Sequence, residues 1–325
     1  MKDTDVQIKV LCAKAMSRAG NAGQGEWVRK AMLDTYSNDP SLRNTLVRAF
    51  TVRKDGANPN VHDTFLKSLK NTSDAEEQLA LLAYFEECGS GNQKFVDAMT
   101  ELYQKSDNIK IQRAVIEALA TKGQGQESVG NLMATCAVSK DTPLALNCLS
   151  GLQSQARRDP RAWPAVQKTI ESSDPDVLMA TLDVINAMPE TPKKEISSRL
   201  VEIVEDTEDS EIQERAVLAL GVCGDHSEPI VKVLRKTLDD DGVDESVRIA
   251  SALVIGKQAE SFPEAPKEAL SKCLQQTKSQ NLKTACQLGL QELATRQAIA
   301  EKSQPSAAIA EAPRETAKES DAESD

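Results

Sequence analysis

The amino-acid sequence predicts an all-α protein built from repeated pairs of helices. Residues that can open a helix recur at intervals of 33 to 36 residues, and apolar residues at helical spacing follow them. Aromatic residues make up only 3% of the chain, whereas hydrophobic residues make up 40%. A low aromatic share with abundant Ala and Leu suits close helix–helix packing and disfavours a β-sandwich.

The clearest copy of the repeat is the stretch 209–225. Asp209 has an acceptor side chain of the kind that caps a helix N-terminus. The apolar residues after it recur every three or four positions, so they share one helix face. They are Ile212, Ala216, Ala219 and Leu220. Gly221 or Gly224 can adopt the left-handed conformation that ends a helix. One such helix cannot bury its own apolar face, so successive copies are expected to stack.

Nine helix-opening residues define the period. Six of the eight acids among them are followed three positions later by an apolar residue. At Asp74 and Asp107 that position holds Glu77 and Lys110 instead, which predicts a local slip of about one residue in the register. The nine residues are Asp3, Asp39, Asp74, Asp107, Asp141, Asp174, Asp209, Asp244 and Ser279.

A second amphipathic segment precedes each helix-opening residue, for example at 26–33 and 94–103. Each repeat is therefore predicted to contain a helix A, a short turn and a helix B that begins after the opening residue. The order predicts a single helix B at about 4–19 and then eight A–B pairs that end near Arg296. Three prolines stand near the starts of helices A, where a missing N–H is tolerated. They are Pro192, Pro229 and Pro263.

The combination of Asp, an aliphatic residue three positions later, an Ala-rich stripe and Gly-x-x-Gly resembles the HEAT repeat in its short, bacterial-style form. The Arg that usually follows the aliphatic residue in this family appears only as Arg43 and Arg248. The resemblance implies a right-handed superhelical solenoid of about eight helix pairs plus an N-terminal half-repeat. It also implies that helix B lines a concave surface. The matching residues are Asp209, Ile212, Ala216, Ala219, Leu220, Gly221 and Gly224, and again Asp244, Val247, Arg248, Ala250, Leu253 and Gly256.

Two regions are expected along the chain. Residues 1–298 form the solenoid, and residues 299–325 form a disordered acidic tail. Ala, Ser, Pro and acids dominate the tail and cannot bury enough apolar area to offset the loss of chain entropy. The half-repeat at the start leaves two alternatives open, an excised piece of a longer array or a helix that acts as an N-terminal cap.

Charge is distributed unevenly along the chain, whose net charge is −11. Residues 1–70 hold twelve Lys or Arg and seven acids, a balance of +5, whereas residues 171–245 hold seven bases and twenty acids, a balance of −13. An acidic region of this kind favours a protein partner with a basic segment and makes nucleic-acid binding unfavourable. The predicted binding residues are Asp183, Asp206, Glu208, Glu211, Glu214, Asp239, Asp240, Asp241 and Arg248.

The seven cysteines are expected to be free thiols that pack as small hydrophobes, because their number is odd and no Cys-x-x-Cys occurs. This expectation favours a reducing, cytoplasmic location, with export as the alternative if a signal has been removed from the N-terminus. The longest apolar run, Ala216–Cys223, is too short to cross a membrane.

Catalysis has little support in the sequence. His62 and His226 lie in or beside helix connections and belong to no metal-binding pair of residues. The acidic turn 239–245 lacks the spacing of a calcium loop. The stretch 157–164 is an isolated basic cluster, and its Trp163 is expected to pack between repeats. No catalytic, cofactor-binding or metal-ligating residue is therefore predicted.

The sequence thus predicts a non-enzymatic protein-binding scaffold or adaptor that presents an extended concave surface. Two alternatives stay open. One is a HEAT-like enzyme or enzyme subunit of the DNA glycosylase or chromophore-lyase type, which requires perturbed acids beside an aromatic-lined pocket. The other is a structural segment of a larger solenoid assembly.

Overall fold

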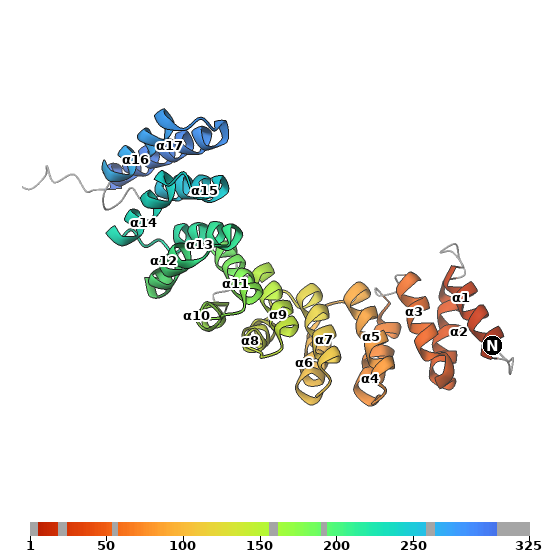
Figure 1. The fold of residues 1–325 in the computed structure, drawn as a ribbon. Helices are drawn as coiled ribbons and strands as arrows, with labels where there is room; N and C mark the ends of the chain where they lie inside the picture. Colours follow the sequence, from red (N-terminus) through yellow and green to blue (C-terminus); the bar gives the residue numbers. More distant parts are fainter. Residues whose placement is uncertain are drawn as a thin grey trace, which may run out of the picture. The chain divides into compact units, whose positions relative to one another are not determined.

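The computed structural model describes residues 6–18, 25–53, 58–155, 162–189, 194–257 and 264–303. These residues form seventeen α-helices, and none of them lies in a strand (Figure 1). The helices follow the predicted order, a single helix B and then eight A–B pairs. They group into two compact units, Met1–Asp225 and His226–Asp325. The predicted all-α repeat fold is confirmed.

In the first unit the helices B form one row, each in contact with the next (red to green in Figure 1). The first of them, α1, contacts α3 without a helix A of its own among the described residues. The row consists of α1 (Val6–Arg18), α3 (Arg43–Arg53), α5 (Ala75–Cys88), α7 (Ile109–Lys122), α9 (Thr142–Gln155), α11 (Pro175–Ala187) and α13 (Ser210–Val222).

The helices A of the first unit pack against the helices B of the same pairs and form a second layer. Helices α4, α6, α8 and α10 also contact one another in sequence. This layer consists of α2 (Gly25–Asn38), α4 (Pro59–Asn71), α6 (Gln93–Lys105), α8 (Glu127–Cys136), α10 (Trp163–Thr169) and α12 (Ser197–Asp206).

The second unit contains two A–B pairs. Helices α14 (Glu228–Asp239) and α15 (Glu245–Ile255) form one pair, and α16 (Glu264–Gln276) and α17 (Gln280–Ser303) form the other. The two helices B approach each other closely at two glycines, since a Cβ added to Gly256 would lie 2.7 Å from the Cα atom of Gly289. Any larger side chain at Gly256 would push the two helices apart.

Seven of the nine predicted helix-opening residues cap helices as expected. The carboxylates of Asp74, Asp174 and Asp209 each accept hydrogen bonds from two backbone N–H groups of the following helix. Single backbone N–H groups donate to the side chains of Asp39, Asp141, Asp244 and Ser279. At Asp39 the helix begins with a 3₁₀ turn, Pro40–Leu42. Asp3 lies outside the described residues.

The prediction at Asp107 is wrong by one residue. The capping side chain is that of Asn108, which accepts a hydrogen bond from the backbone N–H of Lys110 at 3.0 Å. The residue three positions after Asn108 is Ile111, which is buried, so this repeat follows the general pattern. The misplacement arose because Asp and Asn are equally good caps and stand next to each other here.

The position after the aliphatic residue has a repeated structural role. Arg43 and Arg248 each donate from Nε to a carbonyl near the end of their own helix A, that of Tyr36 at 3.3 Å and that of Leu238 at 3.1 Å. In three repeats without this Arg, a glutamine side chain donates in the same way to the end of helix A or the turn after it, at 2.7 to 2.9 Å. These glutamines are Gln78, Gln112 and Gln213.

The predicted apolar stripe forms the core. Ile212, Ala216, Ala219, Leu220 and Cys223 are all buried. Gly224 adopts the left-handed conformation, with φ of 56°, whereas Gly221 lies inside α13. In the first three pairs most of the aromatic residues fill the same interior and contact one another edge to face or tilted. They are Tyr36, Phe50, Phe65, Tyr84, Phe85 and Phe95.

The expectation that all cysteines are free is wrong for four of the seven. Cys136 is bonded to Cys148 and Cys273 to Cys286, and each disulfide joins helix A to helix B within one pair. No local pattern indicates these bonds, because the partners lie twelve and thirteen residues apart on different helices. Cys12, Cys88 and Cys223 form no disulfide, and burial raises the pKa of the Cys223 thiol to about 12. The prediction of a reducing compartment depends on free thiols, so the two disulfides weaken it.

Several predictions fall on residues outside the described part of the chain. Among them are the basic residues 157–161, Pro192, Pro263 and most of the predicted tail. Helix α17 continues to Ser303, beyond the predicted boundary at 298. The division of the chain into a solenoid at 1–298 and a disordered tail stays a prediction. Trp163 begins α10, at the start of a helix A as expected.

Candidate functional site

The predicted acidic set forms two separate groups, because five of its residues belong to the first compact unit and four to the second. In the first unit, Asp183 and Glu211 are engaged with the same arginine. The Nε atom of Arg215 lies 2.7 Å from Asp183 Oδ1, and its Nη1 atom lies 2.9 Å from Glu211 Oε1. This triad links α11 to α13 and neutralises part of the acidic charge. Burial of Arg215 opposes its charge, but the hydrogen bonds to both carboxylates raise its pKa.

Three acids of the first unit keep their charge uncompensated. Asp206 is exposed at the end of α12, Glu208 is exposed in the turn before α13, and Glu214 is half-buried on α13. None of the three makes an ion pair within the described part of the chain. Their charges are therefore not neutralised within the described part of the first unit.

In the second unit two of the three predicted acids form ion pairs with basic side chains. Arg248 Nη1 lies 2.8 Å from Asp241 Oδ1, and Lys272 Nζ lies 2.8 Å from Asp239 Oδ2. Asp240 accepts a hydrogen bond from the backbone N–H of Gly242 at 2.9 Å, which shapes the turn. Over the described ranges, no three potential ligands cluster in a way that could hold a metal ion.

The sequence did not predict a polar network around Glu77, which lies inside the first unit and is only 5% exposed. Tyr36 donates to its Oε1 atom at 3.0 Å and Thr72 donates to its Oε2 atom at 2.8 Å. The guanidinium of Arg43 lies 3.4 Å from Oε2. Burial is the main cause that raises the pKa of Tyr36, and the nearby Glu77 carboxylate adds to it. The signal was present in the sequence, because an acid stood where the repeat calls for an aliphatic residue.

Polar side chains also join successive helices B across the surface of the first unit. Arg113 on α7 donates from Nη2 to both carboxylate oxygens of Asp141, at 2.8 and 3.0 Å. Asn147 on α9 donates to Glu117 on α7 at 3.0 Å. The backbone N–H of Leu144 and then Arg113 lower the pKa of Asp141. These contacts fix neighbouring pairs against each other.

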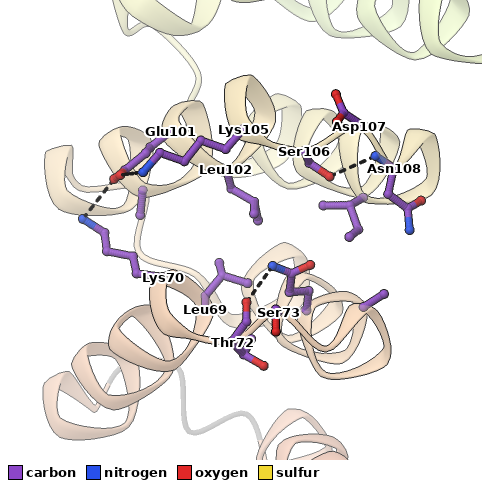
Figure 2. Close-up of a pocket in the computed structure, with 14 residues that line it drawn as sticks. Leu69, Lys70, Thr72, Ser73, Glu101, Leu102, Lys105, Ser106, Asp107 and Asn108 are labelled. Atoms are coloured by element: carbon purple, nitrogen blue, oxygen red, sulfur yellow. Dashed lines mark hydrogen bonds and ion pairs between the residues drawn. The ribbon is translucent and has the colours of Figure 1, made fainter.

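A groove of about 420 Å³ lies between the second and third pairs, where α4 and α6 end and α5 and α7 begin (Figure 2). Leu69, Leu102 and Ile111 contribute apolar side chains to its lining. Lys70 and Lys105 both pair with Glu101, at 3.7 and 2.6 Å, and thereby join α4 to α6 at the rim. Hydrogen bonding to Lys105 is the main cause that lowers the pKa of Glu101. This ion-paired rim is already satisfied within the chain.

A second groove, of about 610 Å³, lies between α3 and α5. Its walls come from exposed or half-exposed positions of two helices B. They are Asn44, Arg48, Thr51 and Val52 on α3, and Glu76, Leu79, Ala80 and Ala83 on α5. A smaller hollow shares Thr51, Val52 and Ala83 and continues to Glu86 and Glu87.

Features expected of the enzyme alternative do not come together in the described residues. Neither groove described above has an aromatic side chain in its lining. His62 is buried against Phe85, with 5.2 Å between ring centroids, and its Nε2 atom lies 3.1 Å from Ser90 Oγ. Burial lowers the pKa of His62. This histidine therefore packs in the interior of the second and third pairs.

Comparison with solved structures identifies the class of fold. The chain superposes on an engineered protein with a TM-score of 0.61 and 19% identity, over 92% of this chain and 89% of that one. It superposes on YibA of Escherichia coli with a TM-score of 0.55 and 10% identity, over 90% of this chain and 98% of that one. These likenesses, together with the sequential helix pairs, show a HEAT-like α-solenoid.

No protein-family model and no curated protein sequence matches the chain. In the part of the chain that the structure describes, no helix is both long and apolar enough to span a membrane.

Proposed function

We propose that the chain is a non-enzymatic protein-binding scaffold or adaptor, and that its binding surface is the outward face of the helix B row. One comparison between neighbouring positions carries this proposal. Eight residues after each cap, six successive helices B of the first unit carry an aliphatic residue that is at most 1% exposed. These residues are Val47, Leu82, Ile116, Leu149, Leu182 and Val217.

The residue at the next position is exposed or half-exposed in each of these helices. Its chemical character varies from helix to helix among basic, apolar, acidic and neutral polar. A uniform interior holds the helices in one frame, and the varied exterior forms an extended surface that suits recognition of one partner more than mere solubility. The six residues are Arg48, Ala83, Glu117, Ser150, Asp183 and Leu218.

The uncompensated acids Asp206, Glu208 and Glu214 add electrostatic selection. Exposed charges of one sign steer a partner of the opposite sign, and their effect decreases with salt. The partner proposed for this surface is therefore a protein with a basic segment, and its association weakens as the ionic strength rises.

The test combines charge reversal with crosslinking. Partner proteins are captured from native extract on the intact chain, crosslinked and mapped by mass spectrometry. Crosslinks are expected on the helix B row, and Asp206→Lys/Glu208→Lys/Glu214→Lys is expected to reduce capture of the same proteins. A matched triple variant reverses three exposed acids on helices A of the same unit, and it is expected to preserve capture. Its positions are Asp34, Asp63 and Asp97.

Two results would count against the proposal. Crosslinks confined to the outer face of the helices A would remove the proposed binding surface. Equal capture by both triple variants would remove the electrostatic selection and leave the scaffold role to the varied exterior alone.

A further inference from the structure

We infer that the groove between α3 and α5 binds an extended partner segment in which an apolar side chain stands between two basic residues. The inference rests on the proposed scaffold function and names the chemistry of one binding subsite.

The floor of this groove is apolar although it faces outward. Val52 is 68% exposed, and Ala83 is exposed beside it. Leu79 and Ala80 are half-exposed and complete the floor from α5. Small residues on α5 leave room above them, so one aliphatic side chain of a partner can cover Val52 and Ala83 together. Binding of such a side chain removes apolar surface of both the groove and the partner from water, which is favourable.

An acidic side chain lies at one end of the groove, and another lines the smaller hollow that adjoins its other end. Glu76 stands in the first turn of α5, and Glu86 stands in its last turn. Both are exposed, and neither makes an ion pair within the ranges that the structure describes. Two carboxylates that bracket an apolar floor complement a segment with basic residues on each side of an apolar one.

Arg48 lies between the two ends, on the α3 wall. It is exposed and has no ion pair among the described side chains. The fixed fork of its guanidinium can donate hydrogen bonds to the main-chain carbonyl groups of a bound segment. An extended segment exposes such carbonyl groups along its whole length, whereas a helix satisfies them internally. Arg48 therefore favours the extended conformation.

The length of the groove sets the spacing of the bases. Glu86 lies ten positions after Glu76 on α5, which corresponds to about 15 Å along the helix axis. An extended chain covers about 3.3 Å per residue, so about five residues span the two acids. The expected pattern is a basic residue, a spacer, an aliphatic residue, a spacer and a second basic residue.

The experiment selects peptides from a random displayed library on the intact chain. Peptides with the basic–x–aliphatic–x–basic pattern are expected to be enriched. A fluorescein-labelled peptide of this pattern is then measured by fluorescence anisotropy. Ala83→Arg places a long cationic side chain over the floor and is expected to weaken binding about tenfold or more. Ala83 is exposed, so the substitution spares the core.

The matched control is Ser198→Arg, which adds the same side chain at an exposed position of α12, a helix A outside the groove and outside the helix B row. This control is expected to leave the affinity within about twofold of that of the wild type. A tenfold loss would correspond to about 1.4 kcal/mol of binding free energy. Glu86→Lys is expected to shift the selected pattern toward an acidic residue at one end. Selection without the pattern would overturn the inference, and so would equal affinity for wild type and the Ala83→Arg variant. The scaffold proposal would survive either outcome if crosslinks still map to the rest of the helix B row.

Discussion

The pairs α4–α5 and α12–α13 share the same capping arrangement, but one buried position holds a carboxylate in the first pair and an aliphatic side chain in the second. Asp74 and Asp209 cap α5 and α13 in the same way, each through two backbone N–H groups. Three residues later α5 carries Glu77 and α13 carries Ile212, and both side chains are 5% exposed.

The difference shows what a buried carboxylate needs in a helical repeat. Glu77 has two hydroxyl donors and a guanidinium within reach, and two of these three groups come from the preceding pair. Ile212 has only apolar packing, which any copy of the frame can supply. The acid therefore joins two particular pairs together, whereas the aliphatic residue only fills a general site.

Transplanting the acid is expected to have the largest effect. Ile212→Glu buries a carboxylate without the three partners of Glu77 and is expected to destabilise α12–α13 by about 3–5 kcal/mol. Hydrogen exchange of the α13 amides measures this local loss, because units of a repeat open separately. The conservative variant Ile212→Val is expected to cost only about 1 kcal/mol. Protection in Ile212→Glu equal to that of Ile212→Val would show that the site admits water.

The reverse transplant is expected to have the second largest effect. Glu77→Ile fills the space but leaves Tyr36, Thr72 and Arg43 without their shared acceptor. The loss of this acceptor is expected to lower the free energy of unfolding by about 1–3 kcal/mol in total. The loss stays in this range because Arg43 is partly exposed and can hydrogen-bond to water instead. Urea unfolding measures the change, with the exposed neighbour Glu76→Ile as the control, which is expected to stay within about 0.5 kcal/mol. A stabilised Glu77→Ile variant would mean that the network is dispensable.

Features that arise within a single helix were predictable from the sequence, whereas contacts between helices were not. Asp209, Ile212 and the stripe after them were predictable because capping and apolar periodicity act within a single helix. Glu77 was visible as an exception, but its partners were not, because Tyr36 and Arg43 lie 41 and 34 residues away. The prediction of free cysteines was wrong for a similar reason, because each disulfide joins residues on two different helices.

The exposure of some candidate residues was predictable. Glu208 lies in the turn after α12 and Asp206 ends that helix, so both side chains are exposed. Ion pairs such as that of Asp183 with Arg215 join neighbouring helices B, so the sequence could not show which acids were already neutralised. The groove between α3 and α5 depends on Val52 and Ala83 meeting across two helices, and no local pattern indicates that.

The caps provide a test in which the two pairs should not differ. Asp74→Ala and Asp209→Ala each leave two backbone N–H groups without an acceptor and are expected to cost about 1 kcal/mol in either pair. Hydrogen exchange of the first turns of α5 and α13 measures the loss, and the Asn variants are expected to restore most of it. A cost at Asp74 much larger than at Asp209 would mean that the Glu77 network depends on the position of its cap.

The smallest expected effect concerns pH. Asp141 caps α9 and also pairs with Arg113 of the preceding pair, so it joins two pairs as Glu77 does, but at the surface. Its pKa is lowered in the folded chain, so its stabilising contribution is present above the pKa of the unfolded chain, near pH 4. That contribution is lost as the pH falls through the lower, folded-state value. Carboxyl NMR titration is expected to show a smaller shift for Asp141 in Arg113→Gln than in wild type. The shift should not vanish, because the backbone N–H of Leu144 still donates to the carboxylate. An unchanged shift in Arg113→Gln would assign the whole effect to the cap, and the surface link would then differ in kind from the buried one.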